Sequence, residues 1–114
     1  MKSIGYIPEK GDVVWLDFDP QAGHEQSGRR PAFVLSPATY NAKTGLMLCC
    51  PITTQVKGYP FEVVTHDSCD VQGVILADQV KSLDWQVRKA EKKARVAKAV
   101  LNEVIAKIKA VLEG

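Results

Sequence analysis

The sequence predicts a mainly β fold with one α-helix: a small SH3-like barrel of bent antiparallel strands followed by a C-terminal amphipathic helix. Two observations lead to this fold class. Short apolar segments separated by turn residues run through about residue 96, which is typical of antiparallel sheet. The remaining residues repeat apolar side chains at three- and four-residue spacing, which is typical of a helix lying on a core. The 114 residues, 1–114, fit a single domain.

The strands follow one another in order along the chain. We expect them at residues 11–19, 32–36, 46–53, 61–64 and 73–77, with a charged edge strand within 87–96. The first strand alternates Val14, Leu16 and Phe18 with Val13, Trp15 and Asp17. The segment 73–77 is apolar on both faces, so it should be a central strand.

Turns and the helix complete the chain. We expect a turn at 41–45, where Gly45 suits a positive φ, and a turn or 3₁₀ segment at 78–85. The amphipathic helix should span Lys98 to Glu113, with Glu103 and Lys107 forming an i,i+4 pair on its polar side.

Composition indicates an ordinary globular protein of the cytoplasm. Hydrophobic residues make up 46% of the chain and charged residues 25%. Neither a membrane span nor the apolar run of a signal peptide is visible. The three cysteines, Cys49, Cys50 and Cys69, have no CxxC spacing and fit reduced thiols in apolar positions. We therefore expect no metal site and no cofactor.

Charge is distributed unevenly. Residues 1–80 carry six Lys/Arg against nine Asp/Glu, whereas residues 81–114 carry nine against four. The basic C-terminal third modestly favours a nucleic-acid ligand and also suits an acidic partner segment that becomes ordered on binding.

Two segments carry the strongest functional signal. A polar loop between Gly23 and Gly28 leads to Arg29 and Arg30, directly before Pro31 and an apolar strand. Because proline cannot donate a ladder hydrogen bond, we expect the strand to begin at Pro31, with Arg30 at its mouth. An arginine there is suited to gripping phosphate with its planar fork. A second apolar strand ends in the hydroxyls of residues 53 and 54.

Six blocks of residues, in order, resemble one known family. They are Gly-Asp-Val-Val-Trp-Leu-Asp-Phe-Asp-Pro at 11–20, Gly-His-Glu-Gln-Ser-Gly-Arg-Arg-Pro at 23–31, Val-Leu-Ser-Pro at 34–37, Pro-Ile-Thr-Thr-Gln at 51–55, Lys-Gly-Tyr-Pro-Phe-Glu-Val at 57–63 and Asp-Gln-Val-Lys-Ser at 78–82. The chain resembles the MazF/PemK toxins of bacterial type II toxin–antitoxin systems, and the MazF branch most closely. The resemblance implies an SH3-like barrel, a homodimer and sequence-specific, metal-independent cleavage of single-stranded mRNA. It also implies an antitoxin whose flexible, acidic C-terminal segment covers the active site.

The resemblance assigns catalytic roles to Arg30 and Thr53. Arg30 would stabilise charge on the phosphorane, and the Thr53 hydroxyl would donate to a phosphate oxygen. Arginine is a poor base, so Glu25 is an accessory residue or the candidate base. His24 is a weaker candidate, because the matched blocks do not require histidine there.

RNA binding should use the rim around these residues. Polar and charged side chains there can contact splayed bases or the backbone; they are Asp17, Gln26, Ser27, Arg29, Gln55, Lys57 and Gln79. Arg29 and Lys57 fit phosphate contacts better than base reading. Trp15 and Trp85 could stack on bases, but tryptophans on strands more often lie in a core or an interface.

Two other functions compete with RNA cleavage. A toxin of the CcdB type shares this architecture and binds DNA gyrase without cutting nucleic acid. The Arg30-Pro31 pair together with Pro51-Ile52-Thr53-Thr54 favours RNA cleavage. A peptide-binding SH3 barrel would need an aromatic groove, which aromatic residues at 7% of the chain support poorly.

Overall fold

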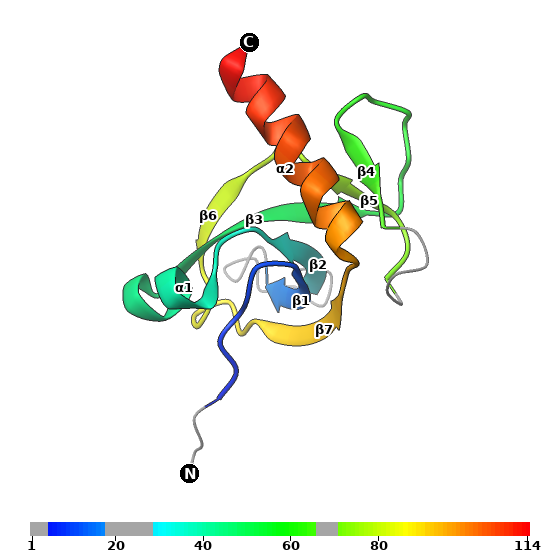
Figure 1. Cartoon of the computed structure of the whole chain (residues 1–114). Helices are drawn as coiled ribbons and strands as arrows, with labels where there is room; N and C mark the ends of the chain where they lie inside the picture. The colour runs from blue at the N-terminus through cyan, green and yellow to red at the C-terminus, as the bar shows by residue number, and fades with distance from the viewer. Residues whose placement is uncertain (1–4, 18–28, 66–70) are drawn as a thin grey trace.

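The computed structural model describes residues 5–17, 29–65 and 71–114. Its elements are β1 (Asp12–Asp17), β2 (Arg29–Val34), α1 (Ala38–Thr44), β3 (Leu46–Thr53), β4 (Glu62–Val64), β5 (Val74–Leu76), β6 (Lys81–Asp84), β7 (Glu91–Arg95) and α2 (Lys98–Glu113). The strands form one antiparallel sheet in the order β4-β5-β3-β2-β1-β7, with β6 also paired to β3 (Figure 1). The predicted mainly β fold with a C-terminal helix is confirmed.

Strand β3 is long enough to join the two parts of the sheet. Its first half pairs with β6 through Leu46↔Asp84 to Cys49↔Lys81, and its end pairs with β5 through Ile52↔Ile75 and Thr53↔Val74. The sheet therefore bends round into a barrel-like shape. Among the described residues no ladder joins β4 to β7, so the barrel is open.

The bent sheet encloses two hydrophobic clusters, and alternate residues of a strand enter different clusters. The first cluster contains Val13 and Cys50, and the second contains Val14 and Cys49. This confirms the expected alternation of the first strand for Val13, Val14 and Leu16, while Phe18 lies outside the described residues. Cys49 and Cys50, adjacent on β3, likewise enter different clusters. Burial raises the pKa of each of these thiols to about 12, so both are protonated at neutral pH.

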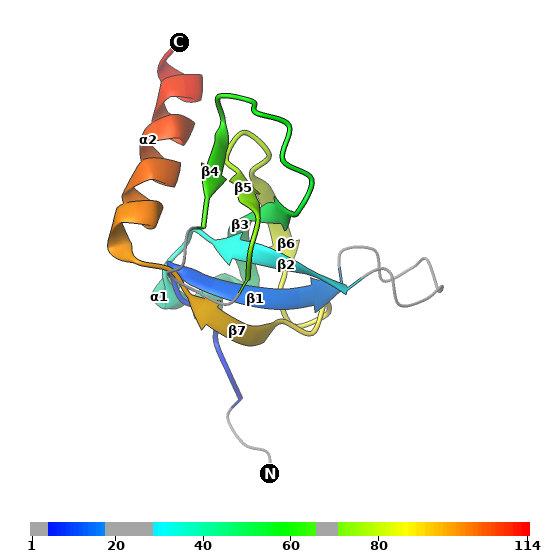
Figure 2. The same ribbon diagram turned by 90° about the vertical axis from the view of Figure 1, so that its right-hand side faces the viewer.

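Helix α2 covers the first cluster on one side of the sheet (Figure 2). Val100 and Val104 are buried against it, and the predicted bounds of the helix are confirmed. The C-terminal end projects beyond the strands, leaving Leu112 78% exposed. The Lys107 ammonium donates to the Pro60 carbonyl at 2.6 Å, which fastens the helix to the segment before β4. Among the described residues the expected ion pair between Glu103 and Lys107 is not formed.

Three local predictions were wrong. The segment expected as a turn at 41–45 is the end of helix α1, although Gly45 does have a positive φ, of 76°. Residues 81–84, expected in a turn, form β6, because the exposed edge of β3 offers them a ladder. Strand β2 includes Arg29 and Arg30, which pair with β1; only its ladder to β3 begins after Pro31, at Ala32.

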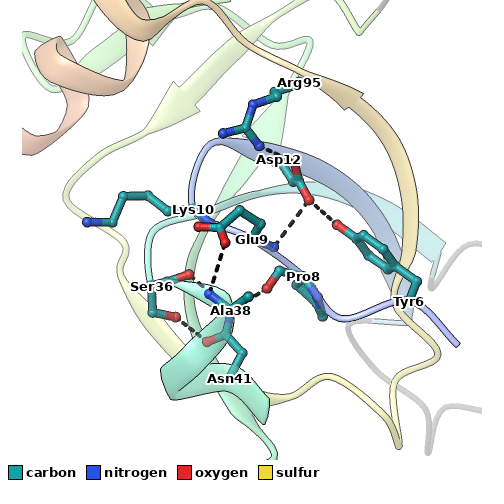
Figure 3. Close-up of polar contacts among 9 residues, drawn as sticks. All are labelled: Tyr6, Pro8, Glu9, Lys10, Asp12, Ser36, Ala38, Asn41 and Arg95. Carbon is teal, nitrogen blue, oxygen red and sulfur yellow. Dashed lines mark hydrogen bonds and ion pairs between the residues drawn. The ribbon is translucent and has the colours of Figure 1, made fainter. Parts of the chain in front are cut away.

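A buried carboxylate links the start of β1 to the end of β7. Asp12 is 1% exposed and accepts hydrogen bonds from the Tyr6 hydroxyl, from the Glu9 amide at 3.2 Å and from Arg95 Nη1 at 2.7 Å (Figure 3). A buried carboxylate needs such partners because it has lost its hydration. Desolvation and the bond to Asp12 both raise the pKa of Tyr6 above its ordinary value.

A second buried group explains why α1 forms. Asn41 is fully buried, and its amide donates to the carbonyls of Pro8 at 2.8 Å and Ser36 at 3.0 Å, while its side-chain oxygen accepts from the Ser36 hydroxyl at 2.6 Å (Figure 3). The Trp85 indole donates to the Asn41 carbonyl at 2.9 Å. Trp85 is therefore a core residue.

In the described part of the chain, no helix is both long and apolar enough to cross a membrane.

Candidate active site

A groove of about 610 Å³ opens where β1, β2, β3 and β7 meet the segment before β5. Arginine, lysine, threonine and one tryptophan dominate its lining, which consists of Trp15, Arg29, Arg30, Pro31, Ile52, Thr53, Thr54, Val71, Gln72 and Lys93. The groove contains both residues to which the sequence analysis assigned catalysis, Arg30 and Thr53. They come from neighbouring strands, β2 and β3.

Arg30 is an exposed side chain on β2, opposite Leu16 of β1. No hydrogen bond or ion pair joins its guanidinium to another described residue. Its five donors and full charge are therefore open to a ligand in the groove. This is the state that a phosphate-binding arginine needs before its ligand arrives.

Arg29 is bound within the protein, in contrast to Arg30. It donates to Asp17 at 3.0 Å, to Glu91 at 3.0 Å and to the Lys89 carbonyl at 2.9 Å. Desolvation lowers the pKa of Arg29, but the bonds to the two carboxylates outweigh it and raise the pKa above its usual value. Arg29 thus joins the ends of β1, β2 and β7 and holds the strand from which Arg30 projects.

Thr53 is the last residue of β3 and is half-buried. Its hydroxyl accepts a hydrogen bond from the Gln55 amide at 3.1 Å, which leaves the hydroxyl proton available to another acceptor. The turn that follows exposes Thr54 beside it in the groove.

A glycine that the sequence analysis assigned only to a strand supports Thr53 from behind. Gly73 has φ +134°, and a Cβ at this position would lie 2.4 Å from the Thr53 carbonyl oxygen. Thr65 holds the same segment, because its amide donates to the Gly73 carbonyl at 3.2 Å and its hydroxyl to the Val71 carbonyl at 2.8 Å. A lone glycine before a short apolar run gives no sequence signal of such a contact.

The other predicted site residues are dispersed. Gln55 and Lys57 lie in the exposed segment after β3, where the Lys57 amide donates to Glu62 at 3.0 Å. Gln79 lies in the exposed connection between β5 and β6. None of these three lines the groove, and their contact with RNA stays a prediction. The predicted residues Glu25, Gln26 and Ser27, and His24, lie outside the described residues.

Seven groove residues were not among the predicted site residues: Trp15, Pro31, Ile52, Thr54, Val71, Gln72 and Lys93. Trp15, weighed as core or stacking residue, is half-buried and lines the groove, so one part of its ring is available for stacking. Gln72 was not singled out, because nothing in its local sequence differs from a solvated surface. Lys93 belongs to the basic C-terminal third that modestly favoured a nucleic-acid ligand, but it was not assigned to this site. Within 5–17, 29–65 and 71–114, no three His, Cys, Asp or Glu residues are grouped so as to hold a metal ion.

Comparison with known proteins identifies the family of the chain. The family model of the PemK-like, MazF-like toxin of type II toxin–antitoxin systems matches residues 9–112. The chain belongs to this family of toxins.

Its relatives place it within the family. The chain is 57% identical over 103 residues to the endoribonuclease toxin MazF of Escherichia coli K12, covering 90% of this chain and 92% of that one. It is 39% identical to the endoribonuclease toxin ChpB of the same strain, covering 92% and 94%. The crystal structure of MazF from Deinococcus radiodurans superposes with a TM-score of 0.86 at 55% identity, covering 96% and 100%. MazF from that organism is also known in complex with MazE, with a TM-score of 0.85 at 49% identity and coverage of 96% and 98%. The resemblance to the MazF branch is confirmed.

Proposed function

We propose that this protein is the toxin of a type II toxin–antitoxin system and acts as a sequence-specific endoribonuclease. It cleaves single-stranded mRNA without a metal ion, and so inhibits translation and growth. The observation that carries the proposal is the convergence of an uncommitted arginine, Arg30, and a strand-end hydroxyl, Thr53, in one open groove. The endoribonuclease toxins of Escherichia coli, at up to 57% identity, support the same activity.

The reaction needs a base for the 2′-hydroxyl, stabilisation of the charge on the phosphorane and a proton for the leaving 5′-oxygen. The 2′-oxygen of the substrate attacks the adjacent phosphorus while its proton passes to a base; the bond from phosphorus to the 5′-oxygen then breaks, and that oxygen takes up a proton. The products are a 2′,3′-cyclic phosphate and a 5′-hydroxyl. Arg30 stabilises the charge that develops on the phosphorane, and the Thr53 hydroxyl donates to one of its oxygens. Glu25 is proposed as an accessory residue or as the base.

Binding of the RNA strand extends beyond the reacting phosphate. Gln55, Lys57 and Gln79 supply contacts at the exposed rim, together with Gln26 and Ser27. Asp17 and Arg29 form an ion pair at 3.0 Å, and their remaining polar atoms contact the RNA.

The partners follow from family membership. The protein forms a homodimer in the cytoplasm, and a cognate antitoxin silences it through a flexible, acidic C-terminal segment that covers the groove. Complexes of MazE with the MazF of Deinococcus radiodurans support such a partner. The nine basic residues of the C-terminal third suit an acidic chain.

Cleavage of a long unstructured RNA in excess EDTA tests the proposal. Wild-type protein should cut at one short motif, and the 5′-hydroxyl and cyclic phosphate ends should be detectable. Arg30→Ala and Thr53→Ala should each lose activity by about 10²-fold or more, as expected for groups that stabilise transition-state charge. Thr54→Ala is the matched control, because Thr54 lines the same groove but has no assigned role. A folded wild-type protein that leaves RNA intact would favour the CcdB-like alternative, binding of DNA gyrase.

A further inference from the structure

Strand β7 contains a β-bulge at the groove. Its register against β1 runs Val13↔Ala94 and then Val14↔Lys92, so Lys93 has no partner residue on β1. An extra residue of this kind bends its strand and redirects its own side chain, and such bulges are frequent beside active sites.

The bulge places the Lys93 side chain in the active-site groove. Lys93 lines the groove together with Arg30 and Thr53, whereas its neighbour Lys92 does not. Both lysines are exposed residues of the same edge strand, so exposure alone does not distinguish them. The extra residue of the bulge, Lys93, is thus the one of the two that lines the groove.

Three cationic side chains line the groove, and one of them is neutralised by carboxylates. Arg29 is neutralised by Asp17 and Glu91 at 3.0 Å each. Arg30 and Lys93 are therefore the groove cations that no described carboxylate pairs with. A single-stranded RNA that places one phosphate on Arg30 brings the next phosphates of its backbone along the same groove.

We infer that Lys93 is a second phosphate ligand, which binds a backbone phosphate beside the one that reacts at Arg30 and Thr53. The inference rests on the proposed function and adds a residue to its substrate site. A lysine suits this task because a phosphate that is held but not reacted needs a point charge rather than a planar fork. Such a contact adds affinity without sequence selectivity.

Salt dependence measures this contact directly. Each phosphate contact on a single strand contributes about 0.7 to the slope of log affinity against log salt. Lys93→Gln should lower that slope by about 0.7 and weaken binding by roughly three- to tenfold at low salt. Lys93→Arg keeps the charge and should retain the slope, while Lys92→Gln is the matched control and should behave as wild type.

The probe is a short fluorescent RNA, fully 2′-O-methylated so that it cannot be cleaved, measured by anisotropy between about 50 and 200 mM salt. Circular dichroism establishes that each variant is folded. A Lys93→Gln variant with the same slope as Lys92→Gln would overturn the inference even if the wild type cleaves RNA. A wild type that binds with the Lys93 dependence but does not cleave would overturn the proposed activity alone. A wild type that neither binds nor cleaves would overturn both.

Discussion

Replacing Gly73 with alanine tests whether the backbone behind Thr53 sets the geometry of the groove. The added Cβ would lie 2.4 Å from the Thr53 carbonyl oxygen and 3.0 Å from its carbonyl carbon. Both atoms belong to the main chain of β3, next to its ladder with β5, so neither can move aside cheaply. The substitution must push Thr53 away or distort the segment 71–73.

The cost has two parts. An alanine at φ +134° carries backbone strain of about 1–3 kcal/mol. Overpacking against a fixed backbone adds about 1–3 kcal/mol more. The expected loss is therefore about 2–6 kcal/mol, a large share of the roughly 5–15 kcal/mol that stabilises a domain.

Gly58→Ala separates the two contributions. Gly58 also has a positive φ, of +82°, but a Cβ there meets nothing within 4 Å. Urea unfolding should show Gly73→Ala less stable than Gly58→Ala by about the overpacking term, 1–3 kcal/mol. RNA cleavage per folded molecule should fall in Gly73→Ala and not in Gly58→Ala. Equal stability and equal cleavage in the two variants would refute the close approach behind Thr53.

Two further predictions follow from the shifted pKa values. The folded protein holds the pKa of Tyr6 above its ordinary 10.0, so the stability that the Tyr6 hydroxyl contributes is present below about pH 10 and is lost as pH rises further. Tyr6→Phe should therefore flatten the fall in unfolding free energy between about pH 10 and 11. An unchanged slope would contradict this. The pKa of about 12 for Cys49 and Cys50 keeps both thiols protonated. In the Cys69→Ser variant, a disulfide reagent at about pH 8 should therefore react with these two thiols only after the protein unfolds. Prompt reaction of the native protein would contradict their burial.

Elements with strong local patterns could be predicted from the sequence. The apolar run of β3 and the helical spacing of α2 were predicted with the bounds that the structure has. Helix α1 was not predicted; its buried Asn41 donates to the carbonyl of Pro8, 33 residues earlier in the chain, and local sequence does not reveal that contact. Strand β6 depends in the same way on the free edge of β3, which supplies a ladder that propensity does not reveal.

The residues of the site also differ in whether local sequence reveals them. Arg30 and Thr53 could be found because a proline and a strand end mark them in the sequence, and the family resemblance orders the blocks around them. Gly73 could not be found, and Lys93 could be found only as one of the basic residues that favour nucleic acid, because their places in the site depend on a 2.4 Å approach and on a register shift. Both features exist only once strands distant in sequence are paired.

Contacts at the base of the hairpin between β1 and β2 hold the ends of these two strands together. Asp17 and Arg29 are cross-strand neighbours and form an ion pair at 3.0 Å, while Arg88 donates to the Asp17 carbonyl at 3.0 Å. The connection of residues 18–28 is therefore closed at its base by groups outside itself. The entropy of closing a loop changes only slowly with its length, so the number of residues between Asp17 and Arg29 contributes little to the closure cost of this hairpin. The strands that carry Arg30 and Thr53 are thus held in register by their own ladders and by this ion pair, whatever the number of residues in the connection.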